Sequence, residues 1–236
     1  FFKSLFLRKD LLITRNIILS LIFFVFRINH TLELHDDLES TGKFISKIFV
    51  KFRILNSKKI KLIFITKNLK DFIRKKYFFS NNKFKILHDA SDIRSIEKIK
   101  CQKKLKLNVG YFGSIYSSRG IITIKKLSKL DQNNKYFIFG GSKKELEKDP
   151  RYKNTQNLFF NKQIPYKNVK KEILKMDVLL MPYTDKATIS GDYGNIINFM
   201  SPMKMFDYLG SGKIILSADI KVLREVLKNN YNSILI

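Results

Sequence analysis

The sequence predicts an α/β protein with two doubly wound domains, of which the second is the clearer. From residue 107 onward, short apolar runs bounded by Gly, Pro, Asp or Asn alternate with amphipathic stretches. This alternation is typical of a parallel sheet covered by helices on both faces. The chain has 236 residues, of which 44% are hydrophobic. That length and composition are sufficient for two packed cores.

Strands and helices are predicted in alternation over the second half. The strands are apolar, short and bounded by turn-forming residues, at 107–112, 136–139, 158–160, 178–181 and 214–217. The helices carry apolar residues three or four positions apart with Lys on the other face, at 121–130, 143–148, 168–175, 203–209 and 222–227. The last four residues, 233–236, also have the composition of a strand.

The first hundred residues repeat this pattern less clearly. Helices are predicted at 16–26, 43–55 and 69–75, and strands at 31–34, 62–65 and 84–87. The polar, charge-rich stretch 89–106 is predicted to be a linker. We therefore expect a partial first domain over 1–95 and a second domain over 96–236 that face each other across a cleft. Ligands of such sheets lie at the carboxyl ends of the strands.

The ends of the chain suggest that it is a piece of a longer protein. It begins with Phe1 rather than Met, and it ends within the strand-like residues 233–236. We expect the start of the first domain and the end of the second to be missing.

The charge of the chain is strongly positive, with a formal value of +26. Such a charge suits nucleic acid, anionic lipid or a phosphorylated ligand. The basic residues are spread along the whole chain, which favours a general bias in residue usage over peripheral contact with an anionic membrane, and both over nucleic acid. Cys101 is alone and cannot form an internal disulfide, so the cytoplasm is the default location. The most apolar stretch, 17–26, is far shorter than the ~20 residues of a spanning helix.

The strongest candidate site is the predicted helix start at Ser201 and Pro202. Ser201 is a good N-cap, and Pro202 suits the first helical position. Free amides at a helix start attract anions, and Lys204 adds a positive charge beside them. Asp207 follows on a neighbouring part of the same face, where it could accept hydrogen bonds from a sugar diol such as ribose. The alternative is an ordinary capped helix with a solvated ion pair, although a cation at a helix start opposes the dipole unless an anion is bound.

A weaker candidate follows the strand at 107–112. Gly113 and Ser114 would let a ligand approach the backbone closely, and Arg119 could bind a diphosphate bidentately at the next helix start. The pattern is not the three-glycine dinucleotide fingerprint, so NAD is not predicted, and a plain strand-to-helix turn is the alternative.

Metal ligands are not evident in the sequence. His35 lies just past a predicted strand, but with its two neighbouring carboxylates it lacks convincing metal-ligand spacing. No Asp-x-Asp pair occurs in the chain. We expect positive side chains and helix amides, rather than a metal, to hold any diphosphate.

Eight segments of the second half form a recognisable series, at 110–114, 119–120, 139–141, 164–165, 177–183, 201–213, 217–219 and 224–227. Taken in order, these segments resemble the donor domain of the family-4-type GT-B glycosyltransferases (glycosyl transferases group 1). In the first half, residues 33–36 and 65–67 resemble shorter segments of the same family.

The resemblance implies a retaining, metal-independent transfer of a sugar from a nucleoside-diphosphate sugar to a hydroxyl acceptor. The acceptor would be a glycan, a lipopolysaccharide or a lipid-linked molecule at the inner face of the cytoplasmic membrane, and no cofactor is implied. The resemblance places Asp207 on the ribose hydroxyls, and Lys204 and Arg119 on the diphosphate. His35 would point toward the transferred sugar.

Further donor contacts are implied at the backbone and the base. These positions are Gly113, Ser114, Ser201, Gln163 and Ile164. The sequence also departs from the family. The usual ribose-binding Glu is the shorter Asp207, its frequent partner Glu falls on Phe199, and a frequent basic residue falls on Ser114.

Two other functions stay open. A sugar-nucleotide epimerase can use a similar pair of α/β domains. A non-catalytic basic module would bind anionic lipid or nucleic acid through its charge, with an affinity that falls steeply with salt.

Overall fold

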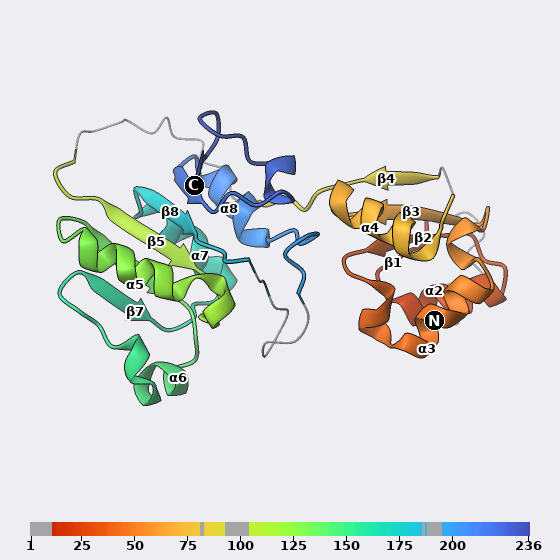
Figure 1. Cartoon of the computed structure of the whole chain (residues 1–236), viewed down its shortest axis with the longest axis horizontal. Coiled ribbons are helices and arrows are strands. Elements are labelled where there is room, and N and C mark those ends of the chain that lie inside the picture. Colours follow the sequence, from red (N-terminus) through yellow and green to blue (C-terminus); the bar gives the residue numbers. More distant parts are fainter. Residues whose placement is uncertain (1–10, 81–82, 93–103, 186, 188–194) are drawn as a thin grey trace. The chain divides into compact units, whose positions relative to one another are not determined.

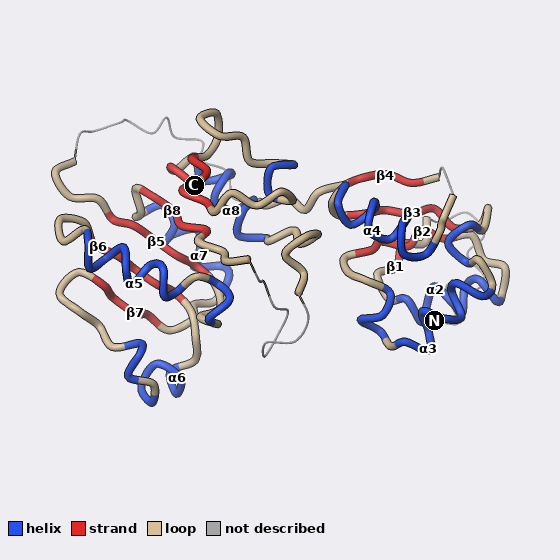
Figure 2. Tube along the Cα trace, viewed as in Figure 1, coloured by secondary structure: helices blue, strands red, loops and turns tan. Residues whose placement is uncertain are grey.

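The computed structural model describes residues 11–80, 83–92, 104–185, 187 and 195–236. The chain forms two compact units, each an α/β unit with one parallel sheet (Figure 1). The first unit contains Phe1–Asp89 and Asn198–Ser201, and the second contains Ala90–Ile197 and Pro202–Ile236. In Figure 2 the strands of each unit lie side by side, with helices outside them. The predicted α/β class with parallel sheets is confirmed.

The first unit has a four-stranded sheet in the order β1-β2-β3-β4. The strands are β1 (Ile13–Thr14), β2 (His30–Leu34), β3 (Ile60–Phe64) and β4 (Phe84–Ile86). The helices between them are α2 (Ile17–Val25), α3 (Lys43–Lys51) and α4 (Lys67–Tyr77). Alternate side chains of the central strands, such as Leu32 and Leu62, are fully buried because successive residues of a strand point to opposite faces. Thr66 caps α4 by accepting a hydrogen bond from the amide of Leu69.

The second unit has a six-stranded parallel sheet in the order β10-β9-β8-β5-β6-β7. Its strands are β5 (Asn108–Phe112), β6 (Lys135–Phe139), β7 (Leu158–Asn161), β8 (Val178–Met181), β9 (Ile214–Ser217) and β10 (Ile234–Leu235). Its helices are α5 (Ile121–Leu130), α6 (Lys143–Lys148), α7 (Tyr166–Leu174) and α8 (Met203–Ser211). The chain moves from β5 outward to β7 and then returns to place β8 on the other side of β5. This reversal makes the carboxyl ends of β5 and β8 a topological switch point, where open α/β sheets bind ligands.

Most predicted elements are present, but two predictions need correction and one strand was not predicted. The helix predicted at 43–55 ends at Lys51, because Arg53 has a left-handed backbone (φ 48°) that breaks it before a 3-10 turn at Ile54–Asn56. The helix predicted at 222–227 is only a 3-10 turn, Leu223–Glu225, a length too short for a cooperative α-helix. The two-residue strand β1 was not predicted, because two residues carry no period.

The apolar helix α2 is nine residues long. Within the described part of the chain, every helix is too short or too polar to cross a membrane. The central part of the predicted linker (93–103) lies outside the described residues.

Two glycines shape the loops that follow β5 and β6. Gly120 and Gly141 both have φ +77°, a left-handed conformation that glycine adopts without penalty. A Cβ at Gly120 would lie 1.6 Å from the carbonyl oxygen of Pro182. A Cβ at Gly141 would instead lie 2.6 Å from the flexible end of the Ile115 side chain. The turn into α5 therefore depends on a close approach between two backbones.

We expect Gly120→Ala to destabilise the protein much more than Gly141→Ala. Both substitutions impose the same left-handed strain of about 1–2 kcal/mol. At Gly120 the backbone must also move, for a total loss of about 3 kcal/mol or more, whereas at Gly141 the Ile115 side chain can shift. Urea unfolding of the two variants measures the difference. Equal losses would show that Pro182 can retreat without cost.

Candidate functional site

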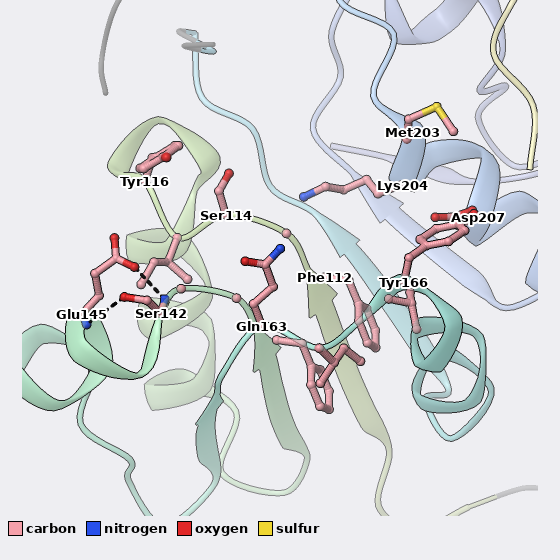
Figure 3. A pocket seen from close by; sticks show the side chains of 17 residues that line it. Phe112, Ser114, Tyr116, Ser142, Glu145, Gln163, Tyr166, Met203, Lys204 and Asp207 are labelled. Atoms are coloured by element: carbon pink, nitrogen blue, oxygen red, sulfur yellow. Dashed lines mark hydrogen bonds between the residues drawn. The ribbon is translucent and has the colours of Figure 1, made fainter. Parts of the chain in front are cut away.

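A cavity of about 410 Å³ lies in the second unit at the carboxyl ends of β5 and β6 (Figure 3). Four stretches of chain line it. They are the end of β5 and its loop (112–116), the end of β6 and its loop (139–142 and 145), the start of α7 (163, 164, 166 and 169) and the start of α8 (203, 204 and 207). The cavity therefore borders the switch point of the sheet.

Bare backbone forms one wall of the cavity. A Cβ at Gly140 would lie 1.9 Å from the carbonyl oxygen of Gly113, so these two loops touch without side chains between them. Gly113 has φ +143°, and its amide donates to the carbonyl of Phe139 at 3.0 Å. The rings of Phe112 and Phe139, which also line the cavity, stack on each other with centroids 4.7 Å apart. A ligand in this cavity can thus come close to the main chain.

Lys204 supplies the cation of the site from the first turn of α8. Its side chain points toward the Gly113 and Ser114 loop (Figure 3). Its Nζ lies 4.0 Å from the centre of the Tyr111 ring and 5.5 Å from that of Tyr183. Burial and then the nearby Arg119 guanidinium lower the pKa of Lys204 to about 7. A bound anion would reverse this effect, because an opposite charge favours the protonated amine.

Asp207 supplies the carboxylate one turn further along α8. Only 5% of the residue is exposed. Its Oδ1 accepts hydrogen bonds from the hydroxyls of Ser91 and Tyr166, the latter at 3.0 Å. The helix itself is fixed to the sheet, because the hydroxyl of the buried Tyr208 accepts a hydrogen bond from the amide of Phe112 at 2.9 Å. Lys204 and Asp207 therefore have defined positions relative to the end of β5.

The prediction that Ser201 caps this helix is wrong. The N-cap is Pro202, which has no side-chain cap, and helix α8 begins at Met203. The hydroxyl of Ser201 is buried and has no hydrogen-bond partner within the described residues. It makes no cap hydrogen bond to the helix start, and Ser201 does not line the cavity. The first-turn amides thus lack the predicted serine cap.

Six of the predicted donor-site residues line the cavity, namely Gly113, Ser114, Gln163, Ile164, Lys204 and Asp207. Arg119 does not line it. Its guanidinium lies 5.6 Å from the Tyr183 ring, and its charge lowers the pKa of Lys204. Neither Tyr166 nor Ser91 was predicted as a site residue. A tyrosine directly after Pro165 at a helix start could have suggested the first of these.

His35 lies in the first unit, directly after β2. Its Nδ1 accepts a hydrogen bond from the Arg15 guanidinium at 2.8 Å, because arginine can only donate. Its Nε2 must then carry the hydrogen that is donated to Glu33 at 2.7 Å. These two contacts fix the orientation of the ring and select the tautomer with its hydrogen on Nε2.

Among the residues that the structure describes, no group of three or more His, Cys, Asp or Glu side chains could hold a metal ion.

Comparison with solved structures identifies the fold. The chain is similar to HepE of Anabaena in complex with UDP, with a TM-score of 0.67 and 13% identity, over 96% of this chain and 64% of HepE. It is also similar to sucrose-phosphate synthase of Thermosynechococcus elongatus, with a TM-score of 0.66 and 11% identity, over 96% of this chain and 60% of that protein. The lipopolysaccharide glycosyltransferase WaaG matches with a TM-score of 0.58 and 15% identity, over 87% of this chain and 60% of WaaG.

These similarities show that the chain has the GT-B fold. It spans less than two thirds of the length of the three proteins. No family model and no curated protein sequence matches it.

The pKa of Lys204 predicts a pH dependence of stability. Its folded pKa of about 7 lies below the ordinary value of 10.5, so between these values the unfolded chain holds a proton that the folded chain has lost. Stability should therefore rise with pH across this window, by less than about 1.4 kcal/mol per pH unit because the residue is only half-buried. We expect Lys204→Met to remove this rise.

The measurement is urea unfolding at pH 7, 8 and 9. The exposed Lys170 on α7 is the matched control, and Lys170→Met should leave the pH dependence as it is in the original protein. Parallel curves for the original protein and Lys204→Met would contradict the lowered pKa.

Proposed function

We propose that this chain is part of a glycosyltransferase that moves a sugar from a nucleoside-diphosphate sugar to a hydroxyl acceptor, with retention and without a metal. The observation that carries the proposal is the pairing of Lys204 and Asp207 on one helix at the mouth of a cavity with a bare backbone wall. A cation and a hydroxyl acceptor one turn apart match the diphosphate and the ribose of a nucleotide.

The second unit, within residues 96–236, would hold the donor. The diphosphate would lie between Lys204, the first amides of α8 and the backbone at Gly113. Arg119, which does not line the cavity, would add positive charge nearby. The ribose hydroxyls would bind Asp207. The base would lie against Gln163 and Ile164, at the start of α7.

Catalysis would rest on charge stabilisation. As the bond between the sugar and the diphosphate breaks, its electron pair passes to the leaving phosphate oxygen, which Lys204 and Arg119 stabilise. The acceptor oxygen bonds to the same sugar carbon from the same face, and its proton goes to the departing diphosphate. His35, whose Nδ1 accepts a hydrogen bond from Arg15, would contact the transferred sugar. The lysine and arginine supply the charge that a metal supplies in other transferases.

The first unit, within residues 1–95, would contribute to the acceptor side. A glycan or lipid-linked acceptor is compatible with the basic charge of the chain, which would also favour the inner face of an anionic cytoplasmic membrane. UDP is the first nucleotide to test, because HepE has been solved with UDP and with UDP-glucose.

We expect the chain to bind UDP in the presence of EDTA, and Lys204→Ala and Asp207→Ala to weaken that binding by roughly 10- to 100-fold. Each variant removes a hydrogen bond to a charged group, which is worth about 1.5–3 kcal/mol. Isothermal titration calorimetry measures the affinity, and Lys170→Met serves as the control for an overall loss of positive charge. Equal weakening in Lys170→Met would indicate non-specific binding through net charge.

Lys204→Ala should lower the turnover of the proposed glycosyltransferase about 100-fold or more, by analogy with the loss of an oxyanion donor. The product should keep the anomeric configuration of the donor, which proton NMR of the new glycosidic linkage reports. Turnover within about threefold of the original enzyme would remove Lys204 from the mechanism. Interconversion of a UDP-sugar without an acceptor would favour an epimerase instead.

A further inference from the structure

The carboxylate of Asp207 already has hydrogen-bond partners from within the chain. Its Oδ1 accepts the hydroxyl of Tyr166 at 3.0 Å and the hydroxyl of Ser91, which is 116 positions away in the sequence. Although Asp207 lines the cavity, only 5% of the residue is exposed. Yet a residue that binds a ribose must offer its oxygens to the ligand.

The two hydroxyls explain how Asp207 stays buried. A buried carboxylate without partners is strongly unfavourable, and hydrogen-bond donors offset the loss of water. Two hydroxyl donors on one carboxylate oxygen also resemble the way in which a carboxylate binds the hydroxyls of a sugar. Ser91 and Tyr166 thus supply the contacts that a ligand would otherwise supply.

The two donors differ in how they are held. Tyr166 is the first residue of α7, which packs against α8, and its ring lines the cavity. Ser91 lies in residues 90–92, which have no regular secondary structure, and it does not line the cavity. Tyr166 is therefore part of the site, whereas Ser91 belongs to no helix or strand.

We propose that the Ser91 hydroxyl is a built-in competitor that occupies Asp207 and gives way to a ribose hydroxyl when the nucleotide binds. This inference rests on the proposed donor site. Tyr166 is the positioning residue that stays in place and holds the carboxylate for the exchange. Since one hydroxyl replaces another, the exchange gains little free energy, and the presence of Ser91 lowers the affinity for ribonucleotides.

The test compares two ligands on the original chain and two variants, with Ser91→Thr as a further control. UDP carries both ribose hydroxyls, and 2′,3′-dideoxyuridine 5′-diphosphate carries neither. Calorimetry with EDTA gives the affinity of the original chain, of Ser91→Ala and of Tyr166→Phe for each ligand. Thermal unfolding of each variant confirms that it is folded.

We expect Ser91→Ala to bind UDP about three- to tenfold more tightly, with no change for the dideoxy ligand, because only a ligand with ribose hydroxyls competes with Ser91. Tyr166→Phe should bind UDP several-fold more weakly and thereby reduce the preference for UDP over the dideoxy ligand. Ser91→Thr keeps a hydroxyl, and its UDP affinity should stay close to that of the original chain.

Two results would overturn the inference. The first is an unchanged or weaker UDP affinity of Ser91→Ala, in a chain that otherwise binds UDP. The second is an equal gain for both ligands, which would show an effect that does not pass through the ribose. Absence of UDP binding in every protein, Ser91→Ala included, would instead overturn the proposed donor site itself, and the competitor with it.

Discussion

The candidate site depends on the attachment of α8 to the end of β5. The Tyr208 hydroxyl accepts the amide hydrogen of Phe112, and one turn earlier Lys204 places its Nζ over the Tyr111 ring. Both contacts join the helix to the same strand end. A Cβ at Gly113 would lie 2.5 Å from the Lys204 Nζ, so the glycine leaves room for the amine. Strand, loop and helix thus set the position of the cation together, and the cavity follows from that arrangement.

Lys204 and Asp207 could be predicted from the sequence because both lie on one helix, where spacing alone fixes their relation. The strands and helices of the second unit could be predicted for a similar reason, since period and turn residues are local. Ser91 could not be predicted, because its contact with Asp207 joins residues 116 positions apart. Arg119 shows the same limit, since its place outside the cavity lining depends on how the turn at Gly120 packs against Pro182.

The positive charges of Lys204 and Arg119 repel each other when no anion is bound between them. Arg119 and burial both disfavour a proton on Lys204, so part of its positive charge is absent near neutral pH. An incoming diphosphate would restore that charge as it binds. Affinity for an anion at this site is therefore coupled to proton uptake, and it should weaken as pH rises above 7.

The position of Phe199 explains why the hydroxyl groups around Asp207 matter. In the resembling family a second carboxylate often stands there, but Phe199 is buried in the first unit, where its ring stacks on Phe72 and its carbonyl accepts the Thr66 hydroxyl. A carboxylate in that apolar contact would be costly. Under the proposed function, Asp207 would bind the ribose without this partner and with a shorter side chain than Glu. The Tyr166 hydroxyl would then supply the orientation that a longer, paired carboxylate would otherwise provide.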